Sequence, residues 1–264
     1  MIPELPLPPP PPTPEAGRTG PRGLPLVTWG WWQAFAVFVV GDLVIGQLVV
    51  GSIVLLAMGI TAGEPIEGLP QIAASVAADA AFLACMVAWL TWRGSDRLRR
   101  VGILLGSRGA RDALVGLGLG VLLYLTVSLL SVPLLSVFRH VFGEHVQPPE
   151  QIPQDLSRNA KIITAFLALV LAPITEELFF RGILYRGVRD RHGVVAGLLV
   201  SALLFGASHV VEGPWQDTLY LQTLMVFTGL GLATIYERRG NLVADIAAHM
   251  AFNVIGIVII FGGH

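Results

Sequence analysis

Seven long apolar stretches constrain the fold of this chain more than any other feature. Their approximate limits are 30–60, 69–91, 113–138, 162–184, 194–211, 218–236 and 242–261. Each is near or above the ~20 residues that cross a hydrocarbon core of ~30 Å. Because lipid offers no hydrogen bonds to the backbone, such stretches form helices rather than strands. The sequence therefore predicts an all-α, polytopic bundle of about seven transmembrane helices, with an eighth only if the stretch 30–60 is split.

The composition agrees with a membrane protein. Apolar residues make up 54% of the 264 positions and charged residues 13%, whereas soluble domains carry about 25% charge. The net charge of −1 argues against a nucleic-acid partner, which requires a basic face. The single cysteine, Cys85, excludes a disulfide within the chain and a zinc site built on thiolates.

The first 28 residues differ from the rest because they are rich in proline. They contain Pro3, Pro6, Pro8, Pro9, Pro10, Pro11, Pro12, Pro14 and Pro21. Such a segment predicts a polyproline-type or disordered tail. We therefore expect a tail at 1–28 and a membrane-embedded helical domain at 29–264.

The charges between the apolar stretches predict the orientation. If the N-terminus is cytoplasmic and the sides alternate, thirteen basic residues are cytoplasmic: Arg18, Arg22, Arg93, Arg97, Arg99, Arg100, Arg108, Arg111, Arg186, Arg189, Arg191, Arg238 and Arg239. Only Arg139, Arg158 and Lys161 are then external. This bias follows the positive-inside rule. It predicts a multi-pass protein of the inner (plasma) membrane with a cytoplasmic N-terminus.

The fourth stretch carries charges that are costly inside a bilayer. Glu177 and Arg181 are one helical turn apart and can pair along one face. Glu176 points about 100° around the helix and has no obvious local partner. A carboxylate without a nearby cation is available to accept a proton. The pair by itself is equally consistent with a structural contact.

Two later stretches carry further polar side chains. His209 ends the fifth stretch, and the last contains His249 and Asn253, four residues apart on one face. Two donors on one face can hold a developing oxyanion. Each also has a structural interpretation: His209 as a satisfied histidine near a helix end, His249 and Asn253 as a bridge between helices.

Three intramembrane aspartates accompany these groups. We interpret Asp42 and Asp79 as lining a cavity or contacting neighbouring helices. Asp245 lies one turn before His249 and is expected to orient its ring.

Three motifs together resemble a known family. They are EELFFR at Glu176–Arg181, FGASH at Phe205–His209 and HMAFN at His249–Asn253. In this order they resemble the intramembrane CAAX-processing and bacteriocin-processing proteases (the CPBP, or Abi, family), whose motifs are Glu-Glu-x-x-x-Arg, Phe-x-x-x-His and His-x-x-x-Asn. The resemblance covers about residues 160–260.

The resemblance implies an intramembrane endopeptidase acting on a peptide or a membrane-anchored protein. Glu176 and His209 would activate a water, Glu177 and Arg181 would shape the site, and His249 and Asn253 would stabilise the oxyanion. No cofactor is certain. A site without metal is consistent with these residues, and so is a divalent metal such as zinc on Glu176, His209 and His249. A silent membrane scaffold and a proton-coupled transporter using the same groups are the alternatives.

The depths of these groups do not agree at first sight. At 1.5 Å per residue, Glu176 and His249 lie roughly 10–13 Å from the cytoplasmic edge, and His209 lies nearer the outer edge. Either the fifth helix begins deeper or is tilted, or residues 187–193 belong to an amphipathic cap.

Overall fold

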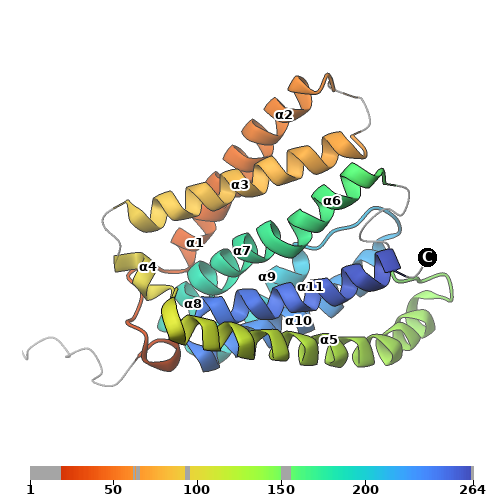
Figure 1. The fold of residues 1–264 in the computed structure, drawn as a ribbon. Helices are drawn as coiled ribbons and strands as arrows, with labels where there is room; N and C mark the ends of the chain where they lie inside the picture. The colour runs from red at the N-terminus through yellow and green to blue at the C-terminus, as the bar shows by residue number, and fades with distance from the viewer. Residues whose placement is uncertain (1–18, 62, 64–65, 93–95, 150–155, 263–264) are drawn as a thin grey trace, which may run out of the picture.

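The computed structural model describes residues 19–61, 63, 66–92, 96–149 and 156–262. Every element in these ranges is helical, which confirms the predicted all-α class (Figure 1). Four helical runs precede the family motifs: α1 (Trp31–Val37) with η2 (Phe38–Gly51) and α2 (Ser52–Ala57), α3 (Leu69–Thr91), α4 (Asp96–Arg100) and α5 (Gly106–Phe142). A short 3₁₀ turn, η1 (Pro21–Gly23), comes before them.

The second half contains the motif-bearing helices. One continuous run comprises α6 (Arg158–Phe166), η3 (Leu167–Leu171), α7 (Ala172–Glu177), η4 (Leu178–Tyr185) and α8 (Arg186–His192). It is followed by α9 (Val194–Ala207), α10 (Trp215–Arg239) and α11 (Leu242–Gly262).

Within the described residues, six helical runs are long and apolar enough to cross a membrane. They are Trp31–Ala57, Leu69–Thr91, Gly106–Phe142, Arg158–His192, Trp215–Arg239 and Leu242–Ile259. The first stretch is one continuous helix, so it does not supply an eighth span. The fifth stretch is shorter than predicted, because α9 has 14 residues and covers only about 21 Å. Six spanning helices and one short apolar helix are consistent with the predicted bundle of about seven.

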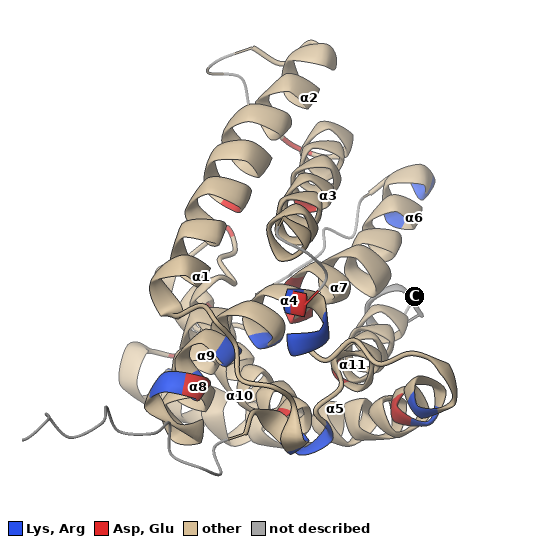
Figure 2. Ribbon diagram, turned by 90° about the vertical axis from the view of Figure 1, so that its left-hand side faces the viewer, with Lys and Arg blue, Asp and Glu red and all other residues tan. Residues whose placement is uncertain are grey.

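Basic side chains gather at one end of the bundle. The arginines of α4, α8 and the first turns of α5 lie at the end where α10 finishes and α11 begins (Figures 1 and 2). Arg158 and Lys161 begin α6 at the other end. The helices thus group these charges as the loop assignment predicts, and we refer to the first group as the arginine-rich end. Which side of the membrane it faces stays a prediction.

The tail predicted at 1–28 lies partly outside the described residues. Its described part, from Thr19 onward, contacts the arginine-rich end. Arg186 is fully buried and donates hydrogen bonds to the carbonyl of Pro25 and to Asp190. The backbone N–H of Val27 donates to the same Asp190 carboxylate at 3.0 Å. Residues ahead of the predicted boundary therefore pack against the helical domain.

The depth disagreement disappears because the motif helix is longer than the apolar stretch. The run does not end at 184 but continues through α8 to His192, so residues 187–193 extend the helix. Glu176 then lies about 24 Å from the turn at Gly193, and His209 about 22 Å from it. The extension of the motif helix to His192 thus places Glu176 and His209 at similar distances from this turn.

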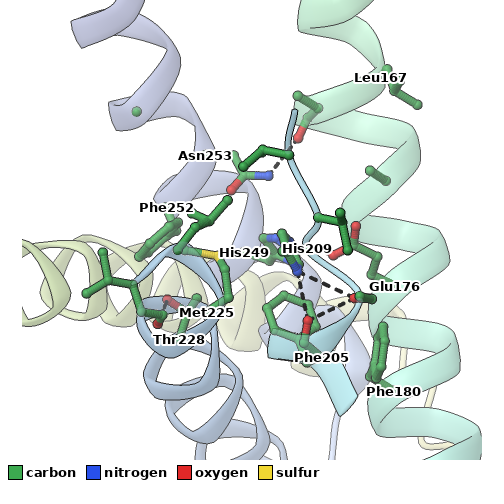
Figure 3. Close-up of a pocket in the computed structure, with 18 of the residues that line it drawn as sticks. Leu167, Glu176, Phe180, Phe205, His209, Met225, Thr228, His249, Phe252 and Asn253 are labelled. Carbon is green, nitrogen blue, oxygen red and sulfur yellow. Dashed lines mark hydrogen bonds and ion pairs between the residues drawn. The ribbon is translucent and has the colours of Figure 1, made fainter. Parts of the chain in front are cut away.

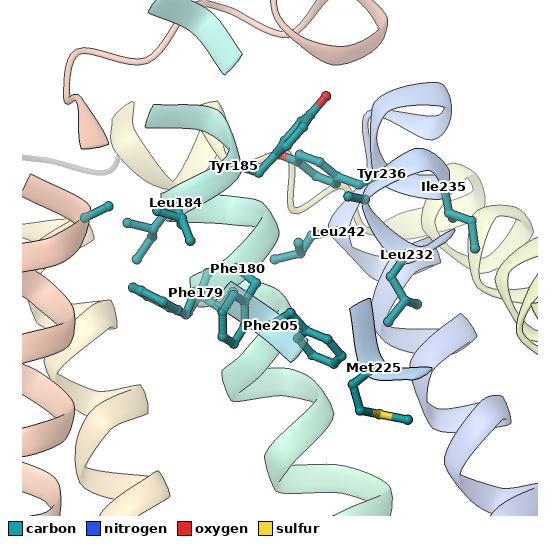
Figure 4. Close-up of a cluster of buried hydrophobic side chains, with 14 of the residues drawn as sticks. Phe179, Phe180, Leu184, Tyr185, Phe205, Met225, Leu232, Ile235, Tyr236 and Leu242 are labelled. Atoms are coloured by element: carbon teal, nitrogen blue, oxygen red, sulfur yellow. The ribbon is translucent and has the colours of Figure 1, made fainter. Parts of the chain in front are cut away.

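Two glycines allow α11, which carries His249, to lie directly against α5. A Cβ atom at Gly116 or Gly120 would collide with the backbone carbonyls of Ala244 and Ala248, respectively. Small residues at such positions let membrane helices approach closely. Behind the motif residues, Phe180, Phe205 and Leu232 form part of the apolar core between η4, α9 and α10 (Figure 4).

Candidate active site

A buried ion pair forms the base of the site. Arg181 Nη1 donates to Glu177 Oε1 at 2.9 Å, and neither side chain is exposed. Arg181 Nη2 donates to the carbonyl of Gly229 at 3.1 Å, and its Nε lies 3.9 Å from Asp245 Oδ2. The guanidinium also lies over the Phe205 ring, 4.6 Å from its centroid. The predicted pairing of Glu177 with Arg181 is present. Arg181 in η4 also contacts residues of α9, α10 and α11.

Glu177 also holds the ring of His249. His249 Nδ1 donates to Glu177 Oε1 at 2.7 Å, and the side chain is almost fully buried. The expectation that Asp245 orients this ring is wrong, because the Nδ1 partner is Glu177 and Asp245 faces Arg181 instead. One carboxylate oxygen therefore accepts from both Arg181 and His249, which leaves His249 Nε2 directed toward Glu176.

Glu176 has a different environment from its neighbour. Its Oε2 lies 3.9 Å from His249 Nε2, and its side chain is 29% exposed. The Oε2 atom itself is buried, and within the described residues it has no hydrogen-bond partner. In agreement with the sequence prediction, no lysine or arginine of the described residues pairs with Glu176, and the basic side chain nearest its Oε2 is the His249 ring. A carboxylate oxygen without a protein partner can accept a hydrogen bond from water.

His209 follows the end of α9 in a turn that the short helix positions. Its Nδ1 lies 2.7 Å from the carbonyl of Phe205. A carbonyl can only accept, so Nδ1 carries the proton and Nε2 of the neutral ring has a free lone pair. The Phe205 ring packs against both histidines, with centroids 4.8 Å from His209 and 5.9 Å from His249. This aromatic ring positions the two imidazoles.

Asn253 is oriented by an irregular segment of the motif helix. Its Nδ2 donates to the carbonyl of Ala168 at 2.8 Å. Ala168 lies in η3, and π-helical turns flank α7 on both sides. Such turns are frequent at functional sites because they change the direction of the backbone groups. The second N–H of the amide remains for another acceptor.

These side chains line one cavity of about 840 Å³ (Figure 3). Glu176, His209, His249 and Asn253 reach it from α7, the turn after α9, and α11. Asp42 and Asp79 also line it, in agreement with one of the two interpretations of these aspartates. Glu177 and Arg181 are not among its lining residues and lie behind it. The structure thus brings all six predicted site residues into one region, with four facing the cavity.

The donor set predicted for a metal is not assembled as a ligand group. In the part of the chain that the structure describes, no three His, Cys, Asp or Glu side chains are grouped so that they could hold a metal ion. Glu176, His209 and His249 share the cavity without forming such a group.

Several contributors to the site were not predicted from the sequence. The carbonyls of Ala168 and Gly229 position Asn253 and Arg181, respectively. A backbone carbonyl leaves no signal in the residue types, so only the fold could identify these two. Phe205 was visible as a motif residue, but its packing on both histidines was not.

Comparisons with known proteins find similarity in the motif-bearing region. Residues 158–255 match the family described as type II CAAX prenyl endopeptidase Rce1-like. A protein of Escherichia coli, described as an uncharacterized 24.3 kDa protein, is 32% identical over 99 residues, which cover 37% of this chain and 44% of that protein. The match thus spans less than half the length of this relative. No solved structure matches the chain. Over residues 158–255, this multi-pass membrane protein is therefore similar to the Rce1-like family of type II CAAX prenyl endopeptidases, which agrees with the resemblance of its motifs.

Proposed function

We propose that this protein is an intramembrane endopeptidase that hydrolyses a peptide bond in the cavity described above. One observation carries the proposal. Glu176, His209, His249 and Asn253, from separate motifs of the family region, line a single cavity within the helical bundle. A general base, a water-positioning group and two donors are the groups that hydrolysis of an amide bond requires.

Glu176 is the proposed general base. A water bound between Glu176 and His209 Nε2 loses a proton to the Glu176 carboxylate as its oxygen attacks the carbonyl carbon. The same proton then passes to the amide nitrogen as the C–N bond breaks, so the leaving product is an amine. The unpartnered Oε2 of Glu176 supports this role.

His249 and Asn253 are the proposed oxyanion donors. The bond from Nδ1 to Glu177 holds the ring so that Nε2 faces the cavity, and in the doubly protonated ring Nε2 donates a hydrogen bond. Asn253 keeps one N–H on Ala168 and uses the other. Donors that are already oriented stabilise the tetrahedral intermediate without reorganisation.

The buried Glu177–Arg181 pair is the proposed support for these donors. Because Arg181 and His249 share one oxygen of Glu177, the pair fixes the ring orientation from behind the cavity. Neither residue is proposed to touch the substrate.

The test is cleavage of quenched fluorescent peptides by the purified full-length protein in lipid nanodiscs. The library includes peptides with a prenylated C-terminal CAAX sequence, and each assay is run with and without a chelator. We expect cleavage by the wild type and none by Glu176→Gln. Cleavage that persists in Glu176→Gln would refute the assigned base, and no cleavage of any peptide would favour a scaffold.

A further inference from the structure

A second group of cavity residues comes from the helices that precede the family match. Phe38 of η2, Phe82 of α3 and Phe179 of η4 form a triangle of aromatic rings. Their centroids are 6.3 Å apart for Phe38 and Phe82, and 5.5 Å apart for each of these with Phe179. Figure 4 shows Phe179 on the side of the core nearest α1 and α3. All three rings line the cavity.

Polar side chains lie about one helical turn beyond each ring. Asp42 follows Phe38, whereas Asp79 and Thr175 precede Phe82 and Phe179. The helix η2 runs away from the arginine-rich end, whereas α3 and α7 run toward it (Figure 1). Each polar side chain therefore lies farther from the arginine-rich end than its ring. Asp42, Asp79 and Thr175 therefore share a layer roughly 5 Å from the rings.

The electrostatic interactions of Asp79 and the residues that line the cavity are consistent with this layer. Asp79 is close enough to interact electrostatically with both Asp42 and Glu176. The cavity is lined by all four of these residues: Asp42, Asp79, Thr175 and Glu176. The polar layer is thus continuous with the proposed general base, and whatever occupies it lies next to the bond that Glu176 would hydrolyse.

The layer has an excess of hydrogen-bond acceptors. Thr175 is almost fully buried, and its Oγ1 has no hydrogen-bond partner within the described residues. Asp42 accepts a long bond of 3.3 Å from the Gln47 amide. No lysine or arginine is found among the described residues that line the cavity. Two carboxylates at membrane depth without a cation are costly, so a positively charged occupant would stabilise this arrangement.

We propose that Asp42, Asp79 and Thr175, with the rings of Phe38, Phe82 and Phe179, form a binding pocket for a basic side chain of the substrate, best an arginine. A guanidinium offers five N–H donors to the two carboxylates and the hydroxyl. Its flat face stacks on the aromatic rings. The pocket selects peptides with a basic residue beside the cleaved bond, and this role rests on the proposed endopeptidase function.

The test uses arginine and its neutral analogue citrulline, which has nearly the same shape. Eight-residue alanine and leucine peptides carry one arginine, or one citrulline, at each position in turn. Cleavage is measured with the wild type. Binding is measured by fluorescence anisotropy with Glu176→Gln, which removes the proposed base, so selectivity has a readout that does not depend on turnover. The charge of each pocket carboxylate is then removed separately, as Asp79→Asn or Asp42→Asn. The matched control is Asp96→Asn, because the Asp96 carboxylate is on α4 and 67% exposed.

We expect the best arginine peptide to bind roughly 10- to 100-fold more tightly than its citrulline counterpart, the range for a hydrogen bond to a charged group. Asp79→Asn and Asp42→Asn should each remove most of this preference, and Asp96→Asn should preserve it. Equal binding of the two peptides, or a preference that survives both cavity substitutions, would overturn the pocket. Cleavage without selectivity would refute the pocket alone, whereas selective binding without any cleavage would refute the endopeptidase function alone.

Discussion

Adjacent glutamates in one motif should respond differently to the same substitution. Glu177 Oε1 accepts from Arg181 at 2.9 Å and from His249 at 2.7 Å, and all three side chains are buried. Glu177→Gln removes the charge that compensates Arg181 and leaves the guanidinium with the Gly229 carbonyl and the more distant Asp245. Breaking a buried pair by removing one partner costs about 3–5 kcal/mol. We expect the lower part of this range, because Asp245 supplies some compensation.

Glu176→Gln should cost little stability. Its side chain is partly exposed, and its Oε2 has no hydrogen-bond partner within the described residues, so we expect a change within about 0.5 kcal/mol. Both substitutions should abolish cleavage, the first by loss of the base and the second by loss of His249 orientation. Only the stability measurement separates these two reasons.

The assay is reversible unfolding in mixed micelles, followed by tryptophan fluorescence, together with peptide cleavage at a temperature where all variants are folded. Glu212→Gln is the matched control, because Glu212 is exposed and does not line the cavity. It should change neither stability nor cleavage. If Glu177→Gln were as stable as the wild type, or if Glu176→Gln were the more destabilised of the two, the assigned division between structural and catalytic glutamate would be wrong.

Three further predictions follow from the structure. Asn253→Ala should lower kcat by about 10²–10³ with little change in KM, because the oxyanion exists only in the transition state; steady-state kinetics showing a raised KM at unchanged kcat would instead indicate a role in substrate binding. In a background without the native cysteine, a cysteine at Glu144 should react with an impermeant reagent added to intact cells and a cysteine at Arg100 should not; the opposite pattern would reverse the orientation. Gly120→Ala should destabilise the bundle by about 1–3 kcal/mol because its methyl group meets the backbone of α11, whereas Gly118→Ala, where nothing lies within 4 Å, should be neutral in the same unfolding assay.

The sequence alone was sufficient for the class of fold and for selecting six residues that the structure brings into one region; that they form a catalytic site stays a prediction. Apolar stretches of membrane-spanning length leave helices as the only stable solution in lipid, so the bundle follows from residue types. The pairing of Glu177 with Arg181 was predictable because residues four apart on a helix are neighbours. The grouping of the arginines at one end was also predictable, because most of them lie between the apolar stretches, in segments assigned to the same side of the membrane.

Helix ends were less predictable. The apolar signal stops at residue 184, but the helix continues to His192, because the buried Arg186 donates hydrogen bonds to the carbonyls of Pro25 and Arg100 in other segments. A hydropathy pattern cannot detect a charged helical turn that is stabilised by tertiary contacts. The helix α9 also ends earlier than its apolar stretch, which the hydropathy pattern did not indicate.

Which partner each buried polar group takes was decided only by the tertiary structure. Asp245 is one turn from His249 along α11, yet the ring bonds to Glu177 on another helix, because the close approach of helices brings Glu177 within 2.7 Å. Asp42 and Asp79 were visible as isolated charges, but their common layer with Thr175 depends on the relative directions and positions of three helices. Local spacing determines neighbours within one helix, whereas contacts between helices depend on packing, which residue spacing along the chain does not encode.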